Sequence, residues 1–205
     1  MKLFFHYSAL GYSNSYILGN EAREAILIDP SHMAKGILNF IENNNYHLRA
    51  ILVTHDHKNH VQGLRTLKRI YDAELYAVNH VIMEHKATLI RDSETLRIDS
   101  FAVEVISIPG HSPDSVVFKI GRMLFTGDAL SAGLIGKTAS NYGDATELAA
   151  LRSKLFSLPY DCMVFPGHGP PSSLESERRF NAGIQLCEEK RRKGFGIPND
   201  LFVQR

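Results

Sequence analysis

The most constraining feature of the sequence is a short apolar run that ends at a cluster of histidines. Residues 51–53, Ile-Leu-Val, are typical of a buried strand because they are apolar and mostly β-branched. Three histidines, His55, His57 and His60, follow within six positions. A strand that stops there would hold the imidazoles on a rigid base at the edge of a sheet. Imidazole is the commonest protein ligand for zinc-type metals and also suits iron, so the cluster predicts a metal site.

Three further candidate ligands each follow a strand-like run and stand in a turn that contains glycine. The turns are Pro-Gly-His-Ser-Pro around His111, Thr-Gly-Asp around Asp128 and Pro-Gly-His-Gly around His168. Chance rarely supplies such a set next to a histidine cluster. The four segments together therefore predict one constellation of metal ligands at the ends of strands.

With these motifs, over about Asn14 to Asn181, the sequence resembles the metallo-β-lactamase fold superfamily, and within it the short glyoxalase II-like hydrolases without a C-terminal glutathione-binding extension. The resemblance implies an α/β fold, a four-layer αβ/βα sandwich of two mixed sheets flanked by helices, and we expect residues 1–205 to form one such domain. It also implies two groups of metal ligands. His55, His57 and His111 would hold a first ion, His60 and His168 would belong to a second, and Asp128 would bridge the two as the catalytic residue.

The resemblance also implies an activity. A metal-dependent hydrolase of this type would cleave a small-molecule thioester, such as a hydroxyacyl-thiol conjugate, by attack of a metal-bound hydroxide on the carbonyl carbon. The expected cofactor is zinc, one ion or two, with iron or manganese as alternatives.

Position 59 departs from the family pattern His-x-His-x-Asp-His, because it is Asn here. The carboxylate ligand of the second ion is therefore missing, and an amide oxygen is neutral and a poor ligand for zinc. This predicts weaker binding of a second ion and allows a mononuclear centre. The alternative is that Asn59 is a tolerated variant.

Three more residues are candidates for supporting or substrate-binding roles. Asp29 follows a strand as the ligands do and would support the histidine loop, or else is a turn residue before proline. Lys137 and Tyr142 fall in a segment expected to form a loop over the site, where Lys137 would meet an anionic part of the substrate. The alternative for both is a solvated loop side chain.

Two rival functions stay open. Persulfide dioxygenases resemble the same pattern and use a single iron held by two histidines and a carboxylate, which here would be His55, His111 and Asp128. The missing carboxylate at position 59 is compatible with that arrangement. The second rival is a non-catalytic binding protein that has kept the fold with a weakened metal site.

Composition and charge exclude other classes of function. At 205 residues, 44% of them hydrophobic, the chain is long enough for one domain with a substantial core. A net charge of +1 argues against a nucleic-acid binder, and no apolar run approaches the ~20 residues that a membrane helix needs. Cys162 and Cys187 match neither a metal motif nor a disulfide framework, and residues 1–10 do not resemble a signal peptide. We expect a cytoplasmic monomer or homodimer with no nucleic-acid or membrane partner.

Hydrophobic periodicity predicts the remaining elements. Strands are expected at 2–7, 15–18, 25–28, 50–53, 75–78, 95–98, 101–108, 115–120, 123–125 and 163–165. Helices are expected at 33–44, 60–70, roughly 80–88, 144–158 and 173–190, with a loop at 129–142 and a tail at 193–205.

Overall fold

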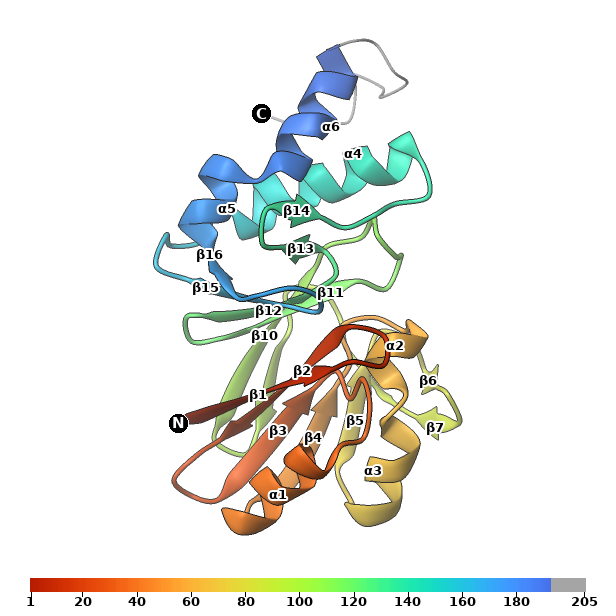
Figure 1. Ribbon diagram of the computed structural model, residues 1–205, viewed down its shortest axis with the longest axis vertical. Helices are drawn as coiled ribbons and strands as arrows, with labels where there is room; N and C mark the ends of the chain where they lie inside the picture. Colours follow the sequence, from red (N-terminus) through yellow and green to blue (C-terminus); the bar gives the residue numbers. More distant parts are fainter. Residues whose placement is uncertain (193–205) are drawn as a thin grey trace.

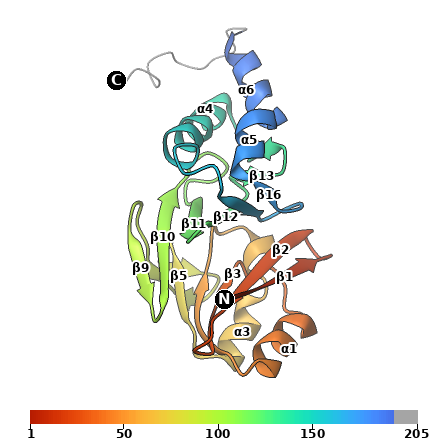
Figure 2. The same ribbon diagram turned by 90° about the vertical axis from the view of Figure 1, so that its left-hand side faces the viewer.

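Two six-stranded sheets lie face to face, and helices cover the outer face of each (Figure 1). The computed structural model describes residues 1–192, with side chains described through residue 190. Figure 2 shows the same layers from the side, with α1 and α3 below the first sheet and α4, α5 and α6 above the second. These layers confirm the predicted αβ/βα sandwich of mixed sheets. The tail predicted at 193–205 lies outside the described residues.

The first sheet is built from the first half of the chain, in the order β1-β2-β3-β4-β5-β8. Strands β1 to β3 pair antiparallel, whereas β3, β4, β5 and β8 pair parallel. Helices on its outer face supply the crossovers from β3 to β4 and from β4 to β5, whereas a short hairpin connects β5 to β8. The elements are β1 (Lys2–Ser8), β2 (Ser13–Gly19), β3 (Glu24–Ile28), α1 (Lys35–Asn43), β4 (His47–Leu52), α2 (Lys58–Val61), α3 (Leu64–Ile70), β5 (Glu74–Ala77) and β8 (Thr88–Leu89).

The second sheet is built from the second half, in the order β16-β15-β12-β11-β10-β9. Only β12 and β15 pair parallel, with α4 in the connection between them. The elements are β9 (Thr95–Ile98), β10 (Phe101–Ser107), β11 (Val116–Ile120), β12 (Met123–Gly127), α4 (Asn141–Ala150), β15 (Met163–Pro166), β16 (Ser172–Ser173), α5 (Leu174–Phe180) and α6 (Ala182–Arg192).

The alternation of side chains along each strand creates the layers. Successive residues of a strand point to opposite faces, so Tyr16 and Leu18 pack between the two sheets while Ile17 packs against the helices of the first half. In the second half, Phe118 faces the space between the sheets and Val117 faces the α4 side. Both faces of the central strands are therefore buried, and only their ends are free to carry functional side chains.

The helix predicted at roughly 80–88 is wrong. This segment forms a hairpin of β6 (Val81–Ile82) and β7 (His85–Lys86), followed by β8. Met83 in its turn has a φ of +55°, a left-handed conformation that an α-helix does not contain. Ile82 is buried while Val81 and Met83 are exposed, so the segment lacks the apolar stripe of a helix.

Other predicted boundaries also differ. The loop expected at 129–142 contains a second hairpin, β13 (Leu130–Ser131) and β14 (Leu134–Ile135), and α4 begins earlier than predicted because Ser140 caps it through the Gly143 amide. The last helix is two helices, because the extended backbone of Asn181 ends α5 and its side chain accepts the Ile184 amide of α6. The helix expected at 60–70 is divided into α2 and α3.

No described helix is long and apolar enough to cross a membrane. The strands that carry the sequence motifs, β4, β10, β12 and β15, end in loops that meet where the two halves join. The fold thereby gathers residues that are more than 100 positions apart in the chain at one place.

Candidate metal centre

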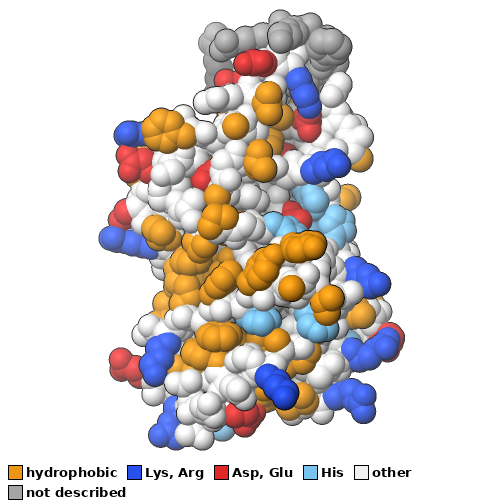
Figure 3. All heavy atoms as spheres, in the orientation of Figure 1, with side chains coloured by type: hydrophobic (Ala, Val, Ile, Leu, Met, Phe, Trp, Pro, Cys, Tyr) orange, Lys and Arg blue, Asp and Glu red, His pale blue; other side chains and the backbone are white. Residues whose placement is uncertain are grey.

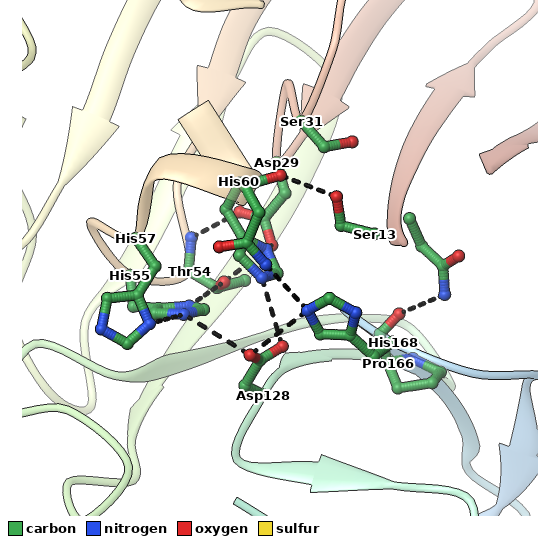
Figure 4. A network of polar contacts seen from close by, with 12 residues as sticks. Ser13, Asp29, Ser31, Thr54, His55, His57, His60, Asp128, Pro166 and His168 are labelled. Carbon is green, nitrogen blue, oxygen red and sulfur yellow. Dashed lines mark hydrogen bonds and ion pairs between the residues drawn. The ribbon is translucent and has the colours of Figure 1, made fainter. Parts of the chain in front are cut away.

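Four side chains from three of these loops converge on one point. Figure 4 shows three of them, His55, His57 and Asp128. The Nδ1 atom of His57 lies 3.0 Å from Nε2 of His55 and 3.1 Å from Nε2 of His111. The Oδ2 atom of Asp128 lies 3.8 Å from the His55 nitrogen and 3.6 Å from the His111 nitrogen. We call these four residues the first group.

Asp128 also belongs to a second group, with His60 and His168. Its Oδ1 atom lies 3.2 Å from Nε2 of His60, and its Oδ2 atom lies 3.5 Å from Nε2 of His168. The structure therefore brings all six predicted ligands together, with Asp128 between the two groups as expected. That they bind an ion stays a prediction of the sequence.

Side chains orient the two buried histidines of the β4 loop. Asp29 accepts a hydrogen bond from Nδ1 of His60 at 3.0 Å, and it also accepts the Thr54 amide and hydroxyl at 2.8 Å and 2.7 Å. The Thr54 hydroxyl also lies 3.1 Å from Nδ1 of His55. Because its own hydrogen is donated to Asp29, the hydroxyl accepts a hydrogen bond from that nitrogen. Gly127 makes room for this arrangement, since a Cβ there would lie 2.4 Å from the Thr54 oxygen.

Backbone carbonyls orient the two histidines of the second half. Nδ1 of His111 donates to the carbonyl of Lys137 at 2.8 Å, and Nδ1 of His168 donates to the carbonyl of Tyr12 at 2.7 Å. Because a carbonyl can only accept, each Nδ1 carries the proton and each Nε2 of the neutral ring presents a lone pair to the cluster. Fixing the tautomer through the outer nitrogen is typical of metal-ligating histidines.

These donor atoms fit a divalent metal ion. Nε2 of His55 and Nε2 of His111 each present a lone pair toward Nδ1 of His57, at 3.0 Å and 3.1 Å, so the three nitrogens face one point where all could bind one cation. Nε2 of His60 and Oδ1 of Asp128, in the second group, are buried 3.2 Å apart. Burial alone would lower the pKa of His60, but the carboxylates of Asp128 and Asp29 raise it to about 10, so without a metal this ring is protonated and pairs with Asp128.

The electrostatics of the first group suit the same role. Burial, with the nearby His60, lowers the pKa of His55 to about 4, so this imidazole is neutral. Burial would raise the pKa of Asp128, but the neighbouring His60 and His168 outweigh it and hold that pKa well below its usual range. A neutral imidazole and an ionised carboxylate are the forms in which these side chains bind metals.

The remaining predicted residues have different fates. Asp29 contacts His60, as expected of a supporting residue, and Asn59 contacts His168. Lys137 contributes only its carbonyl, and its side chain is exposed, while Tyr142 on the first turn of α4 is 63% exposed. Among the described residues no contact joins either side chain to the cluster.

The contributions of Thr54 and of the Tyr12 carbonyl were not predicted. Thr54 directly precedes the histidine cluster in the sequence, so its position offered a signal. The Tyr12 carbonyl had none, since every residue type has a carbonyl.

The cluster opens to solvent on one face. His60 is fully buried, whereas the side chains of His111 and His168 are 12% and 33% exposed. Figure 3 shows histidine side chains gathered at the surface where the two halves join. A small molecule can therefore reach the outer part of the cluster while its inner part stays rigid.

Known proteins share this architecture. The chain is 33% identical over 185 residues to the mitochondrial persulfide dioxygenase ETHE1 of Homo sapiens, covering 85% of this chain and 73% of the relative. It is 28% identical over 192 residues to hydroxyacylglutathione hydrolase GloC of Haemophilus influenzae, covering 82% of this chain and 91% of the relative. The crystal structure of ETHE1 from Myxococcus xanthus superimposes with a TM-score of 0.82 at 26% identity, covering 98% of this chain and 94% of that one.

A family model matches the part of the chain that contains the cluster. The model described as the metallo-beta-lactamase superfamily matches residues 9–168. That range contains both groups of the cluster and the supporting residues Asp29 and Thr54. The hydroxyacylglutathione hydrolase relative also confirms the predicted glyoxalase II-like resemblance. The chain belongs to the metallo-beta-lactamase superfamily.

Proposed function

We propose that the protein is a metal-dependent hydrolase that cleaves a small thioester of the hydroxyacyl-thiol type. The observation that carries the proposal is the convergence of three imidazole nitrogens, from His55, His57 and His111, beside the carboxylate of Asp128. Three imidazoles with one open position suit hydrolytic zinc centres. The name of the relative GloC, a hydroxyacylglutathione hydrolase, supports the substrate class. Zinc is the cofactor we propose, with iron or manganese as alternatives.

A divalent ion held by these residues would polarise the substrate carbonyl and activate water near neutral pH. The protein prepares the donors in advance, because Asp29, Thr54 and two backbone carbonyls fix the imidazoles before substrate arrives. The carboxylate of Asp128, whose side chain is 15% exposed, would accept a hydrogen bond from the attacking water and orient it. The water oxygen bonds to the carbonyl carbon, the C–S bond breaks, and the released proton goes to the leaving thiolate.

Lys137 and Tyr142 are the substrate contacts that we propose. Both are exposed: Lys137 lies in the β14–α4 connection, where its carbonyl orients His111, and Tyr142 lies in the first turn of α4. The Lys137 ammonium would attract an anionic group of the thiol portion. The predicted cytoplasmic location, the predicted oligomeric state and the absence of nucleic-acid or membrane partners remain predictions of the sequence.

Persulfide oxidation by dioxygen is the second candidate function. The observation that favours it is the 33% identity to a persulfide dioxygenase, against 28% to the hydrolase. A site of two histidines and one carboxylate suits mononuclear iron, and His55, His111 and Asp128 would supply it. In that reaction His57 would not be required as a ligand.

The experiment compares His57, in the loop that follows β4, with His47, the first residue of β4. Protein loaded with zinc or with iron(II) is assayed for hydrolysis of a hydroxyacylglutathione thioester and for oxygen uptake with glutathione persulfide. We expect thioester hydrolysis, and we expect His57→Ala to reduce kcat/KM by more than the ~10–100-fold that loss of an outer-shell partner costs. His47→Ala, at the exposed start of the strand, is the matched control and should keep full activity.

Each other outcome has a definite meaning. Oxygen uptake that survives in His57→Ala, without hydrolysis, would replace the hydrolase with the dioxygenase. Protein that binds neither zinc nor iron would overturn both enzymatic readings and leave the non-catalytic binding protein.

A further inference from the structure

The side chain of Asn59 lies on the donor atom of His168. Its Nδ2 atom is 2.9 Å from Nε2 of His168, which is one of the three donor atoms of the second group. The two residues are 109 positions apart, and the contact joins the α2 segment of the first half to the β15 loop of the second. Asn59 therefore reaches into the cluster from its rim.

The direction of this hydrogen bond follows from the other side of the ring. Nδ1–H of His168 donates a hydrogen bond to the Tyr12 carbonyl at 2.7 Å. In the neutral ring, Nε2 therefore has a lone pair and no hydrogen. Only the amide nitrogen of Asn59 can donate to that lone pair, and this fixes which way its amide group points. The lone pair that a second metal ion would need is thus already used within the protein.

The chemical nature of the Asn59 amide also disfavours a second metal ion. A carboxylate at position 59 could not donate to His168, and its negative charge would attract a cation to the second group. The Asn59 amide is neutral and places two N–H groups there instead. Asp128 is then the only carboxylate in the second group, and the first group shares it.

Asn59 is also held in place. The Ser13 hydroxyl donates to its backbone carbonyl at 2.7 Å, and a Cβ on Gly11 would lie 2.9 Å from its own Cβ. Gly11 has a φ of +92°, so this close approach depends on glycine. The turn that contains Gly11, Tyr12 and Ser13 therefore holds both partners of the Asn59–His168 hydrogen bond.

We infer that the centre takes a single metal ion in the first group, and that Asn59 is the positioning residue that keeps the second group closed by holding His168. This inference rests on the metal centre of the proposed function but not on the choice of substrate. It predicts that one residue, and not the shape of the fold, sets the number of ions.

The test is the number of metal ions per chain, measured by elemental analysis after loading with excess zinc and gel filtration. We expect one zinc in the wild type and two in Asn59→Asp, which removes the N–H donors and adds a carboxylate. Asn39→Asp, on the exposed face of α1, makes the same charge change away from the cluster and should keep one. Two zinc ions in the wild type, or one in Asn59→Asp, would overturn the inference. No zinc in the wild type would overturn the inference that the first group takes a zinc ion, and the same measurement with iron(II) would then decide whether the proposed function falls with it.

A second measurement does not depend on the folding of Asn59→Asp. In ¹⁵N NMR spectra of the histidine rings of the wild type, one equivalent of zinc should shift the signals of His55, His57 and His111. The Nε2 signal of His168 should keep the value of a hydrogen-bond acceptor. A zinc-induced shift of the His168 signal as large as the others would show that Asn59 yields its place to the metal, and would overturn the inference. His168→Ala should still bind one zinc, whereas His111→Ala should lose it.

Discussion

Asp29 in the first half of the molecule and Glu147 in the second are both buried carboxyl groups beside the histidine cluster, but their surroundings differ. Asp29 is 2% exposed and accepts three hydrogen bonds, two from Thr54 and one from His60. Glu147 is 0% exposed, and neither of its oxygens has a hydrogen-bond partner among the described residues. It packs against Gly110 and Gly136, which flank His111 in space.

The difference shows in the charge that each site supports. The hydrogen bonds from Thr54 and His60 offset the free-energy cost of burying the Asp29 carboxylate. Through the bond from His60, Asp29 also orients a candidate ligand. Burial raises the pKa of Glu147 to about 8, and the nearby backbone amide of His111 offsets only part of that rise. Glu147 is therefore protonated at neutral pH and acts as a space-filling neutral acid. Burial beside the cluster alone does not make a carboxyl group part of its machinery.

The largest expected effect comes from removing the partnered carboxylate. Asp29→Ala leaves the Thr54 amide and the His60 ring buried without their acceptor, so we expect a loss of about 3–5 kcal/mol in the free energy of unfolding. Urea denaturation in the presence of a chelator measures it without a contribution from bound metal. Asp72→Ala, an exposed aspartate after α3, is the control. A loss below about 1 kcal/mol would mean that the three hydrogen bonds contribute little and that Asp29 resembles Glu147 after all.

Replacing Glu147 should change the free energy of unfolding by a smaller amount and in the opposite direction, so that the protein becomes more stable. Its folded-state pKa of about 8 lies above the ordinary glutamate pKa of 4.5, so the unfolded chain releases its proton first as the pH rises. Stability therefore falls between these two pKa values and levels off above the folded one. Glu147→Gln removes this titration, and we expect it to stabilise the metal-free protein by about 2–3 kcal/mol at pH 8 and by little at pH 4.5.

Unfolding free energies of wild type and Glu147→Gln across that pH range provide the measurement. Glu21→Gln, at an exposed position, should show no such trend. A variant that is less stable than the wild type at pH 8 would indicate that Glu147 is ionised and has a polar partner, which would remove the contrast with Asp29.

The smallest expected effect is at Lys137, which serves His111 only through its carbonyl. Lys137→Ala keeps that carbonyl, so we expect the metal content to be unchanged and the stability to stay within about 0.5 kcal/mol. The KM for an anionic substrate should rise if the ammonium binds it as proposed. Elemental analysis and steady-state kinetics measure the two effects separately. A loss of metal in Lys137→Ala would show that the orientation of His111 depends on the Lys137 side chain. His111 would then resemble His55 and His60, which side chains orient.

The sequence predicted the ten longer strands because most of them are apolar runs between turns. It missed the two-residue strands β6, β7, β8, β13, β14 and β16. It misplaced the segment at 80–88 because nine residues without a clear period fit a short helix and a hairpin equally. The division of the last helix at Asn181 was missed for another reason. The cap depends on a side chain that turns back onto the next helix, and periodicity does not report this.

The six candidate ligands were predictable because each is a distinctive residue type at the end of a strand. The support around them was predictable only in part. Asp29 was a candidate because it also follows a strand, whereas the carbonyls of Tyr12 and Lys137 carry no sequence signal. The substitution at position 59 was evident in the sequence, but the hydrogen bond from Asn59 to His168 required the structure.

The origin of the donor atoms has a consequence for folding. His55, His57 and His60 belong to the first half of the chain, and His111, Asp128 and His168 belong to the second, so neither half alone contains a complete group. An ion bound here would act as a cross-link between the two sheets, and its affinity would be added to the stability of the docked state. A half-folded chain, such as one still emerging from the ribosome, would present only part of the set. Metal capture would then mark the moment at which the two halves have closed correctly on each other.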